Sequence, residues 1–313
     1  MSEVDVTVAE TGARTKGNGA STRRTTACSV PAHVLATGAK SQHGLASIHQ
    51  PQWHCRGIRK APSRMNPIII IPARMASTRL KHKPLADIHG KPMIQHVFER
   101  AVAANVGPVV VAAGDPEICA VIHGLGGTCV LTDPALPRGS DRIFTALKEI
   151  DREHRFDVVI NMQGDQPTTA PGLLTDVLQC LADPEVDVGT LVVPLTQKVD
   201  DPNIVKVVLG RLSGKRGRCL YFSRQPVPHR GPYFYHLGFY AYRRTALDAY
   251  ARLPQSELEL SEDLEQPRLL EAGYRYDAAI VEAAPLSVDT PADLEEARRV
   301  LAGRGRPPQA QLR

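Results

Sequence analysis

A chain of 313 residues is long enough for one large or two modest domains, and its apolar runs are all shorter than the roughly 20 residues that span a bilayer, so we expect a soluble protein. The formal net charge is +5, but residues 1–66 alone carry +6, from nine basic and three acidic side chains, which leaves −1 for the rest. A near-neutral body argues against an extended nucleic-acid-binding face and favours a small ligand.

The six cysteines are scattered, with neither a C-x-x-C pair nor a histidine at zinc-binding spacing. Such thiols are typical of reduced, partly buried cysteines in a cytosolic protein. We therefore predict reduced cysteines and a cytoplasmic protein.

Residues 1–66 are rich in Ala, Thr, Ser, Gly and Arg and show no sustained period of 2 or 3.6. We predict no regular structure there. Three hypotheses stay open: a non-native extension upstream of a true start at Met65, which we favour, a disordered interaction tail, and an organelle transit peptide, which the early acidic residues disfavour.

From residue 67 the chain alternates short, β-branched runs with amphipathic segments. This alternation predicts right-handed crossovers and a parallel sheet. The strands are expected at residues 68–71, 109–113, 128–131, 157–162 and 186–193. The helices are expected at residues 92–102, from 117, at 140–150 and at 173–181. In the first helix we expect a buried stripe of Met93, Ile94, Val97, Phe98, Ala101 and Val102.

After residue 203 the pattern changes to β-type runs at 205–209, 219–222 and 236–242, separated by Gly- and Pro-rich turns. These runs predict a small mixed or antiparallel subregion. A helix at 264–271, a strand at 274–280 and a helix at 291–301 follow, and residues 303–313 are expected to be a flexible tail. The fold class predicted for residues 67–302 is thus α/β, with a doubly wound, mostly parallel sheet and a small β-rich subregion.

The loop after the first strand carries four cations: Arg74, Arg79, Lys81 and Lys83. Open α/β sheets bind their ligands where parallel strands end. A solvated basic surface loop would explain the charge but not its position. We therefore favour a site for an anionic ligand.

This loop, P-A-R-x-x-S-T-R-L followed by K-P-L, resembles the nucleotide-binding loop of the cytidylyltransferases that activate acidic sugars. The resemblance covers residues 67 to about 302 and includes several motifs in the family's order. It implies a fold like that of the nucleotide-diphospho-sugar transferases. It also implies that Arg74, Arg79 and the catalytic Lys83 contact the triphosphate and that Ser77 binds substrate. Lys81-His82 replaces the family's Pro-Gly and leaves Lys81 facing solvent.

Two aspartates are candidate metal ligands. Asp165 follows a predicted buried strand in Gln163-Gly164-Asp165, at the edge of the sheet, and the alternative is a helix cap. The sequence resembles the family's Q-G-D-E-P motif, with Gln166 in place of Glu, and V-D-T-P-x-D-L around Asp289 resembles its C-terminal metal motif. The resemblance implies that Asp165 and Asp289 hold Mg²⁺ and that Gln163 contacts substrate, although Asp289 could instead cap the last helix.

The segment Gly139-Ser140-Asp141-Arg142 opens a predicted helix, where backbone N–H groups can bind a base edge or an anion. It resembles the family's S-G-T-E-R loop, which implies that Gly139, Ser140 and Arg142 bind cytosine. Arg138 departs from the small hydroxyl residue usual before the glycine.

Two runs, L-Y-F-S-R and H-L-G-F-Y, resemble the family's acid-sugar site. They imply that Arg224 pairs with the sugar carboxylate and that His236 and Tyr240 bond sugar hydroxyls; a structural role in the core is the alternative for the last two. Glu265-Gln266 resembles the L-E-Q-L-R segment of the same site, but Pro267 is expected to kink or end its helix.

The resemblance as a whole implies Mg²⁺-dependent transfer of CMP from CTP to the sugar 3-deoxy-manno-octulosonate (Kdo), as used in lipopolysaccharide biosynthesis. It also implies a homodimer. The near-neutral charge of the body and the short apolar runs predict no nucleic-acid or membrane partner. Two alternatives remain: a cytidylyltransferase for another acid sugar, such as a sialic acid, and a non-catalytic CTP-binding relative.

Overall fold

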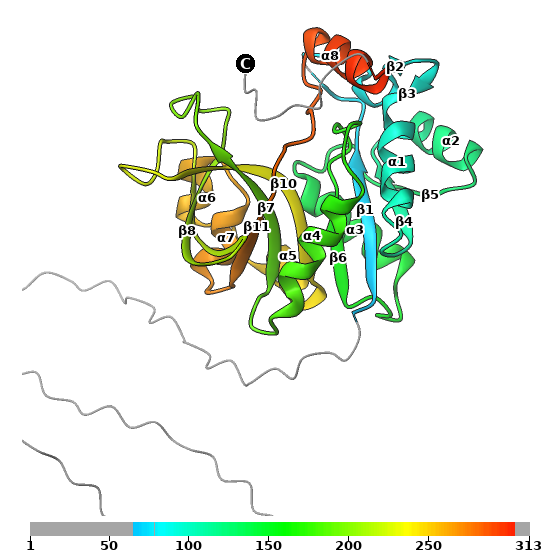
Figure 1. The fold of residues 1–313 in the computed structure, drawn as a ribbon. Coiled ribbons are helices and arrows are strands. Elements are labelled where there is room, and N and C mark those ends of the chain that lie inside the picture. Colours follow the sequence, from blue (N-terminus) through cyan, green and yellow to red (C-terminus); the bar gives the residue numbers. More distant parts are fainter. Residues whose placement is uncertain (1–64, 78, 304–313) are drawn as a thin grey trace, which may run out of the picture. The chain divides into compact units, whose positions relative to one another are not determined.

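The computed structural model describes residues 65–77 and 79–303, and predictions for residues 1–64 and 304–313 lie outside it. One nine-stranded sheet, ordered β5-β4-β1-β6-β10-β7-β11-β9-β8, forms the centre (Figure 1). Its strands are β1 (Pro67–Ala73), β4 (Val109–Ala113), β5 (Thr128–Leu131), β6 (Val158–Asn161), β7 (Val188–Leu195), β8 (Lys206–Ser213), β9 (Arg216–Ser223), β10 (Tyr233–Arg243) and β11 (Tyr276–Ile280). A separate two-stranded sheet pairs β2 (Asp87–Ile88) with β3 (Lys91–Pro92).

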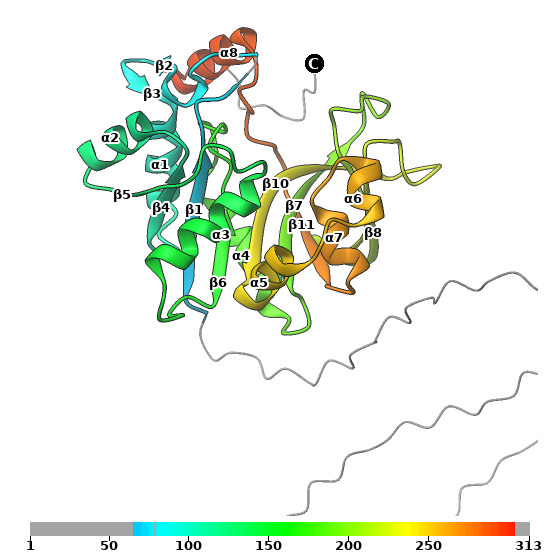
Figure 2. The ribbon, with the colours of Figure 1, turned by 180° about the vertical axis from the view of Figure 1, so that it is seen from behind.

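Helices cover both faces of the large sheet. On the face seen in Figure 1, α1 (Met93–Ala103), α2 (Pro116–Gly124) and α4 (Gly172–Gln179) pack in one apolar core. On the opposite face, seen in Figure 2, α3 (Gly139–Ile150), α5 (Arg244–Arg252) and α7 (Gln266–Glu271) pack in another. The arrangement is the predicted doubly wound α/β fold, in which β1 is buried on both sides.

The last helix, α8 (Pro291–Leu301), lies at the end of the sheet beside β2 and β3 (Figures 1 and 2). It shares a small apolar core with Ile88 and Met93. This contact brings the C-terminal segment next to the loop that follows β1. Residues more than 200 positions apart, such as Lys83 and Asp289, therefore meet at one edge of the sheet.

The predicted β-rich subregion is part of the large sheet. Strands β8 and β9 pair antiparallel, as do β8 and β10, at one side of it. Strand β10 pairs antiparallel with both β6 and β7, in the middle of the sheet. Parallel pairing still joins β5, β4, β1 and β6 on one side and β7 with β11 on the other.

Two details of the helices were predicted wrongly. Val102 belongs to α1 but is 51% exposed, because the buried stripe ends at Ala101. The expected helix at 264–271 is α7, which begins at Gln266. A short helix that was not predicted, α6 (Glu257–Glu262), precedes it and is followed by Asp263 in a left-handed conformation (φ 50°). Pro267 lies in the first turn of α7, where a proline lacks no hydrogen bond, so it begins the helix rather than kinking it.

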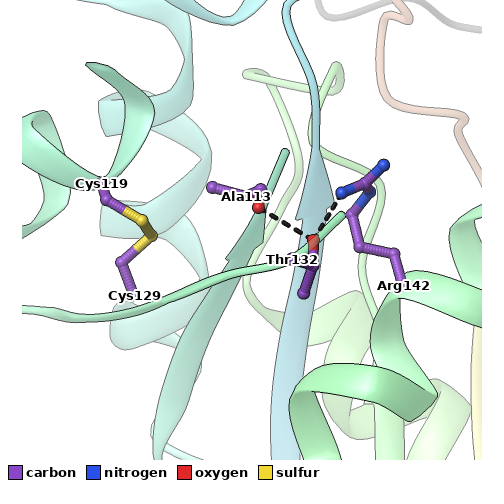
Figure 3. Close-up of a disulfide and its surroundings, with 5 residues drawn as sticks. All are labelled: Ala113, Cys119, Cys129, Thr132 and Arg142. Carbon is purple, nitrogen blue, oxygen red and sulfur yellow. Dashed lines mark hydrogen bonds between the residues drawn. A yellow bond between two sulfur atoms is a disulfide. The ribbon is translucent and has the colours of Figure 1, made fainter. Parts of the chain in front are cut away.

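The prediction of reduced cysteines is wrong for one pair. Cys119 of α2 and Cys129 of β5 form a disulfide, with Cα atoms 5.3 Å apart (Figure 3). Helix α2 leads directly into β5, so packing of the helix beside its own strand brings the two thiols together. Cys180 and Cys219 are free and buried, as expected, and burial raises the pKa of the Cys180 thiol to about 11. Among the described residues, no helix is long and apolar enough to cross a membrane.

Candidate active site

Two carboxylates converge on one lysine at the edge of the sheet. Lys83 Nζ lies 2.8 Å from Asp165 Oδ2 and 3.1 Å from Asp289 Oδ1. Burial lowers the pKa of Lys83, but the two carboxylates outweigh it and leave the pKa above its ordinary value. The three residues assigned to catalysis from the sequence are thus in direct contact.

Backbone hydrogen bonds fix both aspartates. Val288 N donates to Asp165 O at 2.9 Å, which ties the C-terminal segment to the loop after β6. That loop also packs against β1, since a Cβ atom on Gly164 would lie 2.6 Å from the carbonyl oxygen of Pro72. A glycine is therefore required beside Asp165.

Asp289 does not cap α8. Thr290 is the N-cap, and it forms a capping box with Asp293, whose carboxylate accepts from the backbone N–H groups of both Asp289 and Thr290. The Asp289 side chain is left to contact cations. Arg79 Nη2 lies 3.1 Å from Asp289 Oδ1 and is 63% exposed, so a ligand can reach it from solvent.

Two other residues of the loop after β1 face different directions. Ser77 Oγ accepts a hydrogen bond from Leu80 N at 3.4 Å, which bends the loop. Arg74 Nη1 lies 3.4 Å from Leu136 O, across a small cavity of about 110 Å³. The lining of this cavity is Pro72, Ala73, Arg74, Leu136, Pro137, Arg138, Gly139 and Arg142.

Arg142 lines this cavity and is held by hydrogen bonds. Its guanidinium donates to Thr132 Oγ1 and, at 3.1 Å, to Asp133 O, while Thr132 donates to Ala113 O at 2.8 Å (Figure 3). Burial and the nearby Arg74 lower its pKa. Gly114 permits this packing, because a Cβ there would lie 3.0 Å from Arg142 Nη1.

A second cavity, of about 230 Å³, lies beside the first and shares Arg138 and Gly139 with it. Ser140 Oγ donates to the carboxylate of Glu265, joining the start of α3 to the segment before α7. Burial raises the pKa of Glu265, and the bond from Ser140 partly opposes this effect. The cavity lining is Arg138, Gly139, Ser140, Asn161, Gln163, Tyr240, Asp263, Leu264, Glu265 and Gln266.

Two side-chain amide oxygens in this lining are unsatisfied hydrogen-bond acceptors. Asn161 Oδ1 and Gln266 Oε1 are buried and have no hydrogen-bond partner among the described residues. Buried acceptors are normally satisfied, so both are suited to the hydroxyl groups of a ligand. Asn161 was missed in the sequence because it ends a buried apolar strand; the change from apolar to amide at the sheet's edge was the available signal.

Tyr240 and His236 stand behind Gln266. Gln266 Nε2 donates to the Tyr240 hydroxyl, and His236 Nε2 lies 2.8 Å from Thr190 Oγ1. Burial lowers the pKa of His236 to about 3, so the ring is neutral at ordinary pH. Tyr240 lines the cavity, whereas His236 is 5% exposed and supports the cavity wall.

Arg224 and Gln163 are held by backbone carbonyls. The Arg224 guanidinium donates to the carbonyl oxygens of Glu262, Pro202 and Asp263 at 3.0, 3.0 and 3.1 Å. The structure thus does not bring Arg224 into the cavity lining. Gln163 Nε2 donates to Gly238 O at 3.0 Å and remains in the lining.

Gln166 is part of the core rather than of the carboxylate pair. Its side chain is 6% exposed, and Nε2 lies 3.2 Å from Leu237 O. An ionised glutamate could not donate this bond. The departure from the family motif at this position therefore leaves Asp165 and Asp289 unaltered.

The residues fit a divalent cation. Two carboxylate oxygens already share one positive charge, that of Lys83, and hard oxygen ligands of this kind suit Mg²⁺ when substrate phosphates and water complete the coordination. Among the described residues, no group of three or more His, Cys, Asp or Glu could hold a metal ion, so ligands from outside the protein would have to complete the coordination.

Known proteins resemble this chain closely. A family model described as cytidylyltransferase matches residues 68–280. A 3-deoxy-manno-octulosonate cytidylyltransferase of Paramagnetospirillum magneticum is 52% identical over 243 residues, which cover 76% of this chain and 99% of that protein. One of Rhodospirillum rubrum is 52% identical over 240 residues, which cover 75% and 95%.

A solved structure of CMP:2-keto-3-deoxy-manno-octonic acid synthetase in complex with CTP has a TM-score of 0.70 and 40% identity, and it covers 77% of this chain and 100% of that chain. The chain therefore belongs to the cytidylyltransferase family, among the 3-deoxy-manno-octulosonate cytidylyltransferases.

Proposed function

We propose that the protein transfers CMP from CTP to Kdo and releases pyrophosphate, in the synthesis of lipopolysaccharide. The observation that carries this proposal is the pair of adjoining cavities beside the cationic loop and the two aspartates. One cavity adjoins Arg74 and the start of α3, and the other offers unpaired acceptors suited to a polyhydroxylated sugar.

The proposed reaction is an in-line displacement at the α-phosphorus. The anomeric hydroxyl of the sugar loses its proton to solvent and its oxygen bonds to the α-phosphorus, while the bond from this phosphorus to the oxygen shared with the β-phosphate breaks and pyrophosphate leaves. Positioning and charge neutralisation supply most of the catalysis in such transfers. Lys83, Arg79 and Arg74 would contact the triphosphate and stabilise negative charge on the departing pyrophosphate.

We also propose that Asp165 and Asp289 hold Mg²⁺. When bound, this ion would neutralise phosphate charge and polarise the α-phosphate. The aspartates' own role is to fix its position, through the hydrogen bond from Val288 and the capping box of α8.

The location and assembly follow from the same proposal. We propose that the enzyme acts in the cytoplasm, where CTP is available to it. We propose a homodimer because β8 and β9 expose Leu212 (53%) and Leu220 (54%), large apolar side chains that a second subunit could cover. Light scattering coupled to gel filtration tests this state: twice the chain mass of 34.1 kDa is expected, and the mass of a single chain would exclude the dimer.

A substrate panel tests the activity. Purified full-length protein is incubated with Mg²⁺, one of four nucleoside triphosphates, and either Kdo or a sialic acid, and pyrophosphate is measured. We expect release with CTP and Kdo alone. Release with the sialic acid in preference to Kdo would assign another sugar, and CTP binding in calorimetry without any release would indicate a non-catalytic relative.

A further inference from the structure

Arg138 separates the two cavities of the site. It directly precedes α3, and its side chain lines both the cavity beside Arg74 and the larger one beside Glu265. Of the described residues that line the larger cavity, Arg138 alone carries a positive side chain, whereas Asp263 and Glu265 carry carboxyl groups. The family motif gave no role to this residue.

An acidic sugar creates a charge problem in such a cavity. Its carboxylate would enter beside two carboxyl groups of the protein, and like charges at close range repel strongly where water is excluded. Burial makes proton loss from Glu265 costly, which removes only part of the repulsion. A cation in the lining is therefore needed to bind the sugar in its ionised form.

The contacts of Arg138 with the protein are long, so its guanidinium can still pair with a ligand. Arg138 Nε lies 3.5 Å from Glu259 Oε1, and Nη2 lies 3.7 Å from Asp263 Oδ1. Both distances exceed the usual length of an N–H···O hydrogen bond. Glu259 is fully buried and already receives hydrogen bonds from both Nε and Nη2 of Arg268, so it orients Arg138 without being neutralised by it.

Arg224 is the residue that the family resemblance pairs with the sugar carboxylate. Unlike Arg138, it already uses its guanidinium in short hydrogen bonds. Its guanidinium donates three hydrogen bonds of 3.0 to 3.1 Å to backbone carbonyls. Turning it toward a ligand would break them, whereas Arg138, 21% exposed, faces the cavity already.

We propose that Arg138, in the lining of the larger cavity, is a specificity-determining residue of this enzyme that pairs with the carboxylate of the acidic sugar. The proposal rests on the function proposed above. A guanidinium presents two parallel donors that match a carboxylate, so the pairing selects the ionised acid over a neutral analogue.

The test compares two sugars, Kdo and its carboxamide, in which the charge is removed and the shape kept. Pyrophosphate release is measured for the full-length protein and for Arg138→Gln, Arg138→Lys and Arg224→Gln. In Arg138→Gln, we expect KM for Kdo to rise roughly tenfold to hundredfold, as for the loss of a charge-assisted hydrogen bond. KM for CTP should change less than KM for Kdo, and the preference for Kdo over the carboxamide should be lost.

Arg138→Lys should recover part of that preference, because it keeps the charge but not the paired donors. Arg224→Gln should keep the preference. A merely structural role for Arg138 would lower the rates with both sugars alike, and that result would overturn the proposal, as would a preference lost in Arg224→Gln and kept in Arg138→Gln. Lys215→Gln, at a side chain 73% exposed, is the matched control for loss of a cation.

Failure of the two proposals can be told apart. If the unaltered protein releases no pyrophosphate with CTP and Kdo, the proposed function is wrong. If it turns over Kdo and Arg138→Gln leaves KM and the preference unchanged, the function stands and the role of Arg138 is excluded.

Discussion

Individual charges determine the chemistry of this site. Asp165 and Asp289 come from segments far apart in the sequence, and each could have been only a helix cap. The structure resolves this alternative for Asp289, because Thr290 takes the capping role. A residue's type and position can suggest a ligand, but only the neighbouring cap shows which side chain is left for catalysis.

Removal of either carboxylate should abolish turnover. Asp165→Asn and Asp289→Asn keep the shape of the side chain but halve the negative charge around Lys83, so we expect at least a hundredfold loss of kcat, of the order found when one electrostatic group of an active site is removed. Circular dichroism and the melting temperature should show an intact fold. Asp87→Asn, at an exposed residue of β2, is the matched control, and full activity in either variant would exclude the two-carboxylate site.

His236 makes the protein sensitive to acid. Its pKa is about 3 in the folded state because of burial, below the ordinary 6.5. As the pH falls below 6.5, only the unfolded chain binds this proton, so this histidine lowers the free energy of unfolding by up to about 1.4 kcal/mol per pH unit until about pH 3. Its contribution to stability is fully present above pH 6.5.

The substitution His236→Asn should therefore flatten the loss of stability in acid. Urea unfolding of the variant and the unaltered protein at pH 6, 5 and 4 measures the difference. We expect their free energies to converge as the pH falls. Parallel curves would show that this histidine is not held neutral.

Secondary-structure elements were predictable where a short-range pattern specifies them. The strand at 109–113 and the helix at 291–301 have the bounds expected from their apolar runs and their turn residues. Helix α6, with the sequence ELELSE, was missed because a six-residue helix shows too little periodicity. The place of β10 between β6 and β7 could not be predicted, since long-range pairing determines the order of strands.

The disulfide joins two secondary-structure elements, α2 and β5. A cross-link across 10 positions should stabilise the fold by about 2–3 kcal/mol, mainly by restricting the unfolded chain. We expect reductant to lower the free energy of urea unfolding by that amount. The double variant Cys119→Ser, Cys129→Ser should be insensitive to reductant, and an unaltered protein equally stable with and without reductant would contradict the cross-link.

The capping box of α8 should matter for both stability and activity. Thr290→Ala removes the acceptor for Asp293 N, with an expected loss of about 1 kcal/mol. Because Asp293 also holds the backbone of Asp289, kcat should fall as well. Thr290→Ser keeps the hydroxyl and should be close to the unaltered protein; an Ala variant equal to it in unfolding and turnover would show that the cap does not position Asp289.

At the scale of the whole molecule, the order of motifs along the chain was enough to indicate the family, and the comparisons confirm it. The arrangement of side chains around the cavities could not be predicted in the same way. How α3, α7 and β10 pack together determines three features of the site: the position of Asn161, the hydrogen bonds of the Arg224 guanidinium, and the place of Arg138 in the cavity lining. Single motifs do not encode such packing.

This site should join CMP to Kdo. Phosphorus NMR of the full-length protein with CTP, Kdo and Mg²⁺ follows this reaction directly, since the product and the leaving group give separate signals. The three CTP resonances should disappear, and one phosphodiester resonance of CMP-Kdo and one resonance of pyrophosphate should appear, with the two products in equal amounts. CTP that persists unchanged, or that is hydrolysed to CMP without the sugar ester, would contradict this reaction.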